Sequence, residues 1–210
     1  MGSIQQTLAS FGGAATTFSP ADIAGLTLWL KADAIVGLND GDPVASWADS
    51  SGLSNTATGA AIQRPEYKTA IVNSLPVVRF NGTTNYLTTP SISAITAWTV
   101  FFVSKGTEVA ANYFLDAADG SHSIISNFVA GKFEYYSSPR TVLGDASTSV
   151  FSVITCSVGG TSTGTWTVAA AAGGGDPWGG DIAEIIAYNS ALSGGDTASV
   201  QGYLATKYGL

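Results

Sequence analysis

From residue 25 onward, apolar and polar residues of this chain alternate in short segments, a pattern typical of strands with one buried face. The segment LTLWLK (26–31), for example, places three leucines on one side. Segments of this kind are PVVRFNG (76–82), NYFLD (112–116), SIISNFV (123–129), KFEYYSS (132–138), VFSVITCSV (150–158), GTWTVAA (164–170) and DIAEIIAYN (181–189). Gly, Asn and Ser lie between them, and such regular spacing of short strands favours an antiparallel β-sandwich.

Two segments depart from this alternation. WTVFFVSKG (98–106) is apolar on both faces, as expected for a strand that is covered on both sides. Near the C-terminus, Ser193 and Asp196 resemble a helix capping box. Val200, Leu204 and then Lys207 or Tyr208 follow at helical spacing, with Tyr203 adjacent. No alternation of strands and crossover helices is visible, which argues against a parallel α/β sheet. The sequence therefore predicts an all-β, two-sheet antiparallel sandwich with one short C-terminal helix.

The composition divides the 210 residues into a small-residue N-terminal arm, 1–18, and one domain, 19–210. Charged residues make up 11% of the chain, against about 25% in ordinary soluble domains. The net charge is −7, and the eight basic residues are scattered along the sequence. Because phosphate binding needs clustered Lys and Arg, we expect neither a nucleic acid nor an anionic membrane surface as partner.

The single cysteine, Cys156, cannot form an internal disulfide and is expected to be a small buried apolar residue. The single histidine, His122, excludes a zinc site with two histidines. No apolar run reaches the ~20 residues of a membrane-spanning helix, and the N-terminus lacks the basic and apolar regions of a signal peptide. These features predict a protein that folds in the cytoplasm, without membrane insertion.

Asp181 and Glu184 are the most conspicuous acidic residues of the last predicted strand. Residues three apart in a regular strand point to opposite faces, so the two carboxylates could converge only across a bulge. A retaining glycosidase needs its two carboxyl groups about 5–5.5 Å apart. The positions two and four residues from Glu184 are Ile182, Ile186 and Tyr188. This spacing predicts a role in closing the sheet, and a protein that is not an enzyme.

Other candidate residues fall in turns. Asp40 and Asp42 lie in an Asp-Gly-Asp-Pro segment, which suits either an ordinary turn or a calcium site, and no other cofactor is expected. Tyr135, Tyr136 and Trp178 lie beside turns and are candidates for exposed contacts with a glycan. Trp29 and Trp98 lie within strands, where contacts in the core are expected.

Three stretches of the chain resemble laminin-G-like, concanavalin-A-like jelly-roll domains of phage virion proteins and bacterial surface proteins. They are residues 18–58 (FSPADIAGLTLWLKADAIVGLNDGDPVASWADSSGLSNTAT), 64–87 (RPEYKTAIVNSLPVVRFNGTTNYL) and 180–210 (GDIAEIIAYNSALSGGDTASVQGYLATKYGL). The resemblance covers roughly residues 18 to 210 and implies the jelly-roll form of the sandwich. It implies structural roles for these motifs, and does not fix an activity.

Three classes of function follow. The first is a virion structural protein, a capsid decoration, head-fibre or tail adhesin subunit, located in the virion and anchored to other virion proteins or sister chains through residues 1–18. Its outward domain would then be free to bind host-surface glycans. The alternative is a carbohydrate-binding module of a bacterial surface protein. The third, a glycan-active hydrolase, is disfavoured by the carboxylate spacing.

Overall fold

The computed structural model describes residues 17–107, 112–119, 122–127, 132–135, 141–145 and 150–210. Its strands are β1 (Leu26–Lys31), β2 (Ser46–Trp47), β3 (Ala57–Thr58), β4 (Glu66–Val72), β5 (Leu75–Asn81), β6 (Leu87–Gly106), β7 (Asn112–Ala117), β8 (Ser123–Asn127), β9 (Lys132–Tyr135), β10 (Thr141–Asp145), β11 (Ser152–Val168) and β12 (Gly179–Tyr188). Three short 3₁₀ helices (Pro20–Asp22, Ala32–Ala34 and Ala61–Gln63) and one α-helix, α1 (Gly194–Tyr208), complete the described elements. The predicted all-β class with one C-terminal helix is confirmed.

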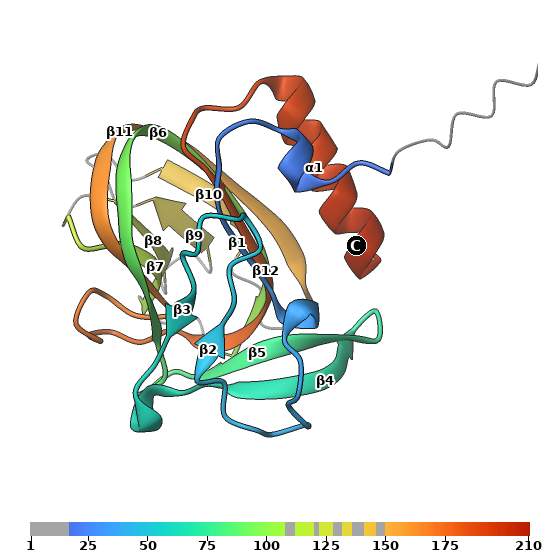
Figure 1. The fold of residues 1–210 in the computed structure, drawn as a ribbon, viewed down its shortest axis with the longest axis vertical. Helices are drawn as coiled ribbons and strands as arrows, with labels where there is room; N and C mark the ends of the chain where they lie inside the picture. The colour runs from blue at the N-terminus through green and yellow to red at the C-terminus, as the bar shows by residue number, and fades with distance from the viewer. Residues whose placement is uncertain (1–16, 108–111, 120–121, 128–131, 136–140, 146–149) are drawn as a thin grey trace, which may run out of the picture.

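The described strands pair antiparallel, and the main path runs β10-β9-β8-β7-β11-β6-β12-β5-β4, with β1 beside β12. The two longest strands, β6 and β11, pair along most of their length and curve, so that the sheet folds over into two layers (Figure 1). The sequence predicted two strands at 150–158 and 164–170, whereas the structure has one. Its register shifts between Gly159 and Gly164 mark a bend where the prediction placed a turn.

The main core lies between the two layers. Aromatic rings from both layers meet there, and Phe102 of β6 stacks on Phe114 of β7 with ring centroids 4.1 Å apart. Trp98 packs edge-on against Trp166, with centroids 5.3 Å apart. Cys156 belongs to the same core and is fully buried, as predicted. Burial raises the pKa of its thiol to about 12.

A second core lies between the outer face of the β1–β12–β6 layer and α1 (Figure 1). Phe101 of β6 and Ile186 of β12 face the helix residues Val200, Leu204 and Tyr208, which repeat every four positions and are all buried. The segment 98–106 is thus covered on both sides, as its sequence predicts. None of the described helices is long and apolar enough to cross a lipid bilayer.

The caps of α1 explain where this helix begins and ends. The Ser193 hydroxyl accepts a hydrogen bond from the Asp196 amide (3.1 Å) and donates one to the Asp196 carboxylate (2.8 Å), which confirms the predicted N-terminal cap. Gly209 ends the helix in the left-handed conformation, with φ 67°, where a glycine is favoured.

Candidate functional site

A bulge in β12 controls the direction of its acidic side chains. The register with β6 shifts between Ile182 and Glu184. As a result, Ile182 and Ile185 both point into the sandwich core, although they are three residues apart. Glu184 then points outward, beneath α1, where it contacts residues of the helix. The expectation that Asp181 and Glu184 lie on opposite faces is therefore wrong, because Asp181 also pairs with an outer-face residue, Arg79 of β5.

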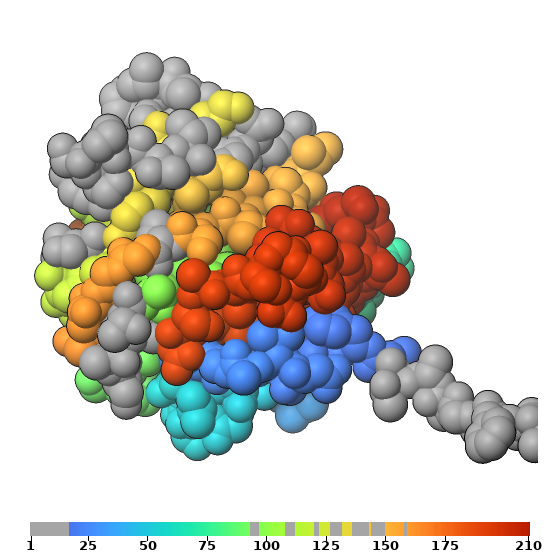
Figure 2. Space-filling model, turned by 90° about the horizontal axis from the view of Figure 1, so that it is seen from above, coloured from blue at the N-terminus to red at the C-terminus, as the bar shows by residue number. Residues whose placement is uncertain are grey.

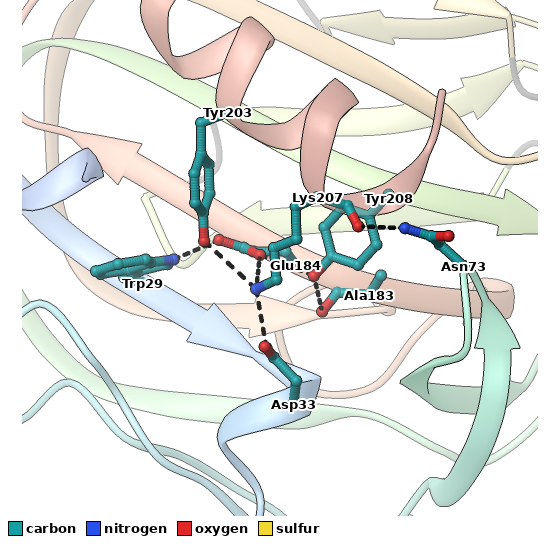
Figure 3. A network of polar contacts seen from close by, with 8 residues as sticks. All are labelled: Trp29, Asp33, Asn73, Ala183, Glu184, Tyr203, Lys207 and Tyr208. Carbon is teal, nitrogen blue, oxygen red and sulfur yellow. Dashed lines mark hydrogen bonds and ion pairs between the residues drawn. The ribbon is translucent and has the colours of Figure 1, made fainter. Parts of the chain in front are cut away.

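Glu184 is the centre of a buried polar network under α1 (Figure 3). Its Oε1 accepts a hydrogen bond from the Trp29 indole (2.5 Å), and its Oε2 accepts bonds from Tyr208 (2.7 Å) and Lys207 (2.8 Å). Burial, and then the Glu184 charge, raise the pKa of Tyr208, so that its hydroxyl stays protonated and donates. The network joins β1, β12 and α1, so Glu184 links the helix to the sheet.

The same network positions two residues at the surface. The Lys207 ammonium group also bonds Asp33 (2.9 Å) and Tyr203 (3.4 Å), so three protein oxygens surround its three protons. The Tyr203 ring packs edge-on between Trp29 and Phe18, with centroids 6.3 and 6.4 Å away. Tyr203 and the Lys207 stem are therefore held in one place before any ligand arrives.

These residues line a groove that we call the α1 groove, with a volume of about 690 Å³. It runs between the helix and the segment that begins at residue 17, which lie against each other in Figure 2. Its lining residues are Thr17, Phe18, Ser199, Gly202, Tyr203, Thr206 and Lys207. The groove thus combines two aromatic rings with the hydroxyl groups of two threonines and one serine. Chemically, such a surface suits a ligand with apolar faces and polar edges.

Gly202 lines the α1 groove without a side chain. A glycine inside a helix costs about 0.5–1 kcal/mol relative to alanine, so its presence needs a reason. A Cβ placed at Gly202 would meet nothing within 4 Å, which shows that packing within the protein does not require the glycine. A side chain at this position would instead extend into the groove.

A second, smaller hollow lies where β5 ends, with a volume of about 320 Å³. Arg79 lines it and donates from Nε and Nη2 to both carboxylate oxygens of Asp181, at 2.6 and 2.9 Å. The Asp181 side chain is 3% exposed, whereas 38% of the Arg79 side chain is exposed. We call this feature the β5 hollow, and its further lining residues are Arg64, Glu66, Phe80, Asn81, Asn85 and Thr107.

The two aspartates proposed for calcium have protein partners. The Asp40 carboxylate accepts bonds from Lys68 Nζ (2.7 Å) and the Thr69 amide (2.9 Å), and these interactions lower its pKa below 3.8. Asp42 accepts a hydrogen bond from the Asn39 amide (2.7 Å), as in an ordinary turn. Among the described residues, no group of three or more His, Cys, Asp or Glu side chains gathers as a metal site. Calcium at this loop remains a prediction.

The aromatic residues proposed for glycan contacts are placed differently from what the sequence indicated. Trp178 is 1% exposed and packs against Phe114, with centroids 5.1 Å apart. Tyr135 is also buried and lies edge-on to Trp98. Their expected exposure is wrong, because both side chains belong to the sandwich core. Tyr136 lies outside the described residues, as do residues 1–16 of the predicted arm.

Sequence reasoning missed both surface features. Phe18 and Tyr203 come from opposite ends of the chain, and Arg64 and Arg79 were counted among scattered basic residues. Gly202 was the one signal of the α1 groove in the sequence, because a glycine in the middle of a predicted helix lowers helix stability and so indicates a packing or functional reason. Trp29 and Trp98 do lie in buried clusters, as expected, although Trp29 belongs to the cluster under the helix.

Neither family models nor curated proteins give a match with this chain. Among solved structures, domain 4 of AbnA, a GH43 extracellular arabinanase from Geobacillus stearothermophilus in complex with arabinotriose, is similar at 17% identity. The TM-score is 0.56, with 84% of this chain and 98% of that domain covered. A sialidase from Trypanosoma rangeli in complex with sialic acid gives a TM-score of 0.59 at 12% identity, covering 88% of this chain. The chain spans only 33% of that sialidase.

At these identities the comparisons show the fold, a β-sandwich, and do not show the laminin-G-like family. They also correct one prediction. The chain was expected not to be an enzyme, but this is contradicted by the likeness to structures from two glycoside hydrolases. The fold therefore gives no ground for excluding an enzyme. No comparison bears on a virion origin, on virion partners or on localisation, which remain sequence-based predictions.

Proposed function

We propose that this chain is a carbohydrate-binding domain and that the α1 groove holds a segment of a sugar chain. The observation that carries the proposal is the groove itself, in which aromatic rings and hydroxyl groups share one exposed surface. The similar AbnA domain, whose structure is that of a complex with arabinotriose, supports the choice of ligand class. This proposal corresponds to the carbohydrate-binding module, which was predicted from the sequence as the alternative to a virion protein.

The size and composition of the α1 groove fit this role. Its volume of about 690 Å³ lies within the range of about 300–1,000 Å³ that is typical of small-ligand sites. A sugar ring has an apolar face formed by C–H groups and an edge of hydroxyl groups. The rings of Phe18 and Tyr203 offer the apolar contact, and the hydroxyl groups of Ser199 and Thr206 lie on the helix side.

The rigidity of the groove wall supports binding as well. Tyr203 and Lys207 are held by contacts with Trp29, Asp33 and Glu184, so little side-chain entropy remains to be lost when a ligand binds. Lys207 contributes mainly its aliphatic stem, because the three contacts of its ammonium group are with protein oxygens.

A pair of glycine substitutions tests the proposal. Neutral oligosaccharides, with arabinotriose among the first probes, are screened on a glycan array, and the best ligand is titrated by calorimetry. We expect Gly202→Leu to weaken binding by about tenfold or more, because the leucine side chain fills the groove. The helix itself should be at least as stable as in the wild type, since leucine is the better helix former.

Gly194→Leu is the matched control. Gly194 lies in the same helix, a Cβ at this position would also meet nothing within 4 Å, and the residue does not line the groove. This variant should bind like the wild type. If the Gly202→Leu variant binds as tightly as the wild type, the α1 groove is not the binding site. An array on which no glycan binds would contradict carbohydrate binding itself.

A further inference from the structure

We infer that the β5 hollow is a second binding site, separate from the α1 groove, and that it takes a carboxylate flanked by a hydroxyl group, as in a uronic acid. The hollow is small, about 320 Å³, which suits a single sugar acid or hydroxy acid. The inference rests on the residues of the hollow and does not depend on the proposed function of the α1 groove.

Basic side chains are concentrated at the hollow. The chain has a net charge of −7 and only eight basic residues, yet two of them, Arg64 and Arg79, line this one hollow. Among the described residues that line it, Glu66 alone is acidic. Arg64 takes part in no ion pair within the described part of the chain, so its charge is available to an anion.

Arg79 is oriented by the acid behind it. Asp181 uses both carboxylate oxygens to hold Nε and Nη2, which fixes the plane of the guanidinium group. The exposed part of the side chain borders the hollow. Since a guanidinium group presents five N–H donors in one plane, this arrangement leaves donors for a second planar acceptor such as a carboxylate.

The rim of the hollow is also fixed by hydrogen bonds. The Asn81 side-chain oxygen accepts bonds from the amides of Thr83, Thr84 and Asn85, at 2.9–3.0 Å. The Asn85 side chain donates to the Arg64 carbonyl (2.9 Å), while Arg64 Nε donates to the Gly59 carbonyl (3.3 Å). The backbone that carries both arginines is thus ordered in advance, which lowers the entropy cost of binding.

Glu66 adds a negatively charged hydrogen-bond acceptor to the site. It lies opposite Arg79 in the β4–β5 pairing and is exposed. A carboxylate can accept a hydrogen bond from a hydroxyl group, but its charge repels another carboxylate. A ligand that carries both groups, with the carboxylate toward the arginines and the hydroxyl toward Glu66, satisfies the whole hollow.

Substitutions of Arg64 and Glu66 test the site without disturbing the buried Asp181. Trigalacturonate, free lactate and neutral galactotriose are titrated at low ionic strength into the wild type, Arg64→Gln and Glu66→Gln. We expect Arg64→Gln to weaken binding of the acids by about tenfold, the equivalent of one charged hydrogen bond. Glu66→Gln should strengthen it several-fold, because the glutamine oxygen still accepts a hydrogen bond from the ligand's hydroxyl group while the repulsion between carboxylates is removed.

The controls separate this site from the α1 groove and distinguish the two sources of the acid. Gly202→Leu should leave acid binding unchanged, so failure of one site does not decide the other. Tighter binding of trigalacturonate supports the site and assigns it to acidic glycans, whereas equal binding of lactate supports it and assigns it to free hydroxy acids. Absence of acid binding, unchanged affinity in Arg64→Gln, or weaker affinity in Glu66→Gln would each overturn the inference.

Discussion

Asp181 and Glu184 lie three residues apart on the same strand and face the same side of it, yet their surroundings differ. Glu184 is completely buried, and its partners from β1 and α1 surround both of its oxygens. Asp181 is nearly as buried, but its partner Arg79 reaches the surface and borders an open hollow. The difference comes from what lies above each residue: α1 covers Glu184, and the end of β5 leaves Arg79 exposed.

The two carboxylates differ in whether a partner of theirs is open to solvent beside a hollow. A buried carboxylate whose two oxygens are both taken up by protein donors can hold elements together, but it has nothing left for a ligand. A buried carboxylate with an exposed partner orients that partner toward solvent. At the α1 groove, too, a buried carboxylate orients residues at the surface. The Glu184 network holds Tyr203 and Lys207, and these two residues line the groove.

Glu184→Ala should produce the largest effect in this comparison. The substitution leaves the Trp29 indole and the Tyr208 hydroxyl without their acceptor and removes one partner of a buried ion pair. We expect the free energy of unfolding, measured by urea titration, to fall by about 3–5 kcal/mol. Tyr208→Phe, which removes the hydroxyl that contacts Glu184 (2.7 Å) and the Ala183 carbonyl (3.4 Å), should cost about 1–2 kcal/mol. A loss below that of Tyr208→Phe would show that Glu184 does not anchor the helix.

Asp181→Asn should have an intermediate effect. Arg79 loses its ionic partner, but the exposed guanidinium group can be solvated by water. The free energy of unfolding should therefore fall by only about 1–2 kcal/mol. The same urea titration measures it. A loss as large as that of Glu184→Ala would show that the two carboxylates do not differ in how they stabilise the fold.

Asp40→Asn should have the smallest effect and a clear pH dependence. Bonds from Lys68 and Thr69 stabilise the ionised Asp40 and hold its pKa below 3.8. A lowered folded-state pKa adds stability that is present above the unfolded-state pKa and is lost as the pH falls through the folded-state value. The wild type should thus be slightly more stable than the variant near neutral pH, and the difference should shrink as the pH drops below 3.8. Urea midpoints at a series of pH values check this, and a difference that grows in acid would contradict it.

The sequence predicts those elements whose signal is local. The alternation in 26–31 coincides with β1, and Ser193 with Asp196 marks the start of α1, because strand period and helix capping depend on residues close together. The continuous strand β11 was missed because glycine favours bends and turns alike. The bulge after Ile182 leaves no distinctive residue in the sequence, so the direction of Glu184 could not be predicted.

The surface features were beyond sequence reasoning for a different reason. The α1 groove exists only because the chain near Phe18 packs beside Tyr203, and the β5 hollow because Arg64, which precedes β4, and Arg79 of β5 line the same space. Contacts between distant segments have no periodic pattern to reveal them. The predicted exposure of Tyr135 and Trp178 was wrong for another reason. A turn next to a residue in the sequence does not tell whether its side chain points inward, and both side chains are buried.

Chemical-shift mapping of the ¹⁵N-labelled protein with the tightest neutral oligosaccharide tests the central claim most directly. We expect the perturbed backbone amides to gather at Ser199, Gly202, Tyr203 and Thr206, while the chemical shifts of Asn81 and Thr107 stay unchanged. Perturbations that avoid the helix, with the neutral sugar bound elsewhere on the sandwich, would contradict it.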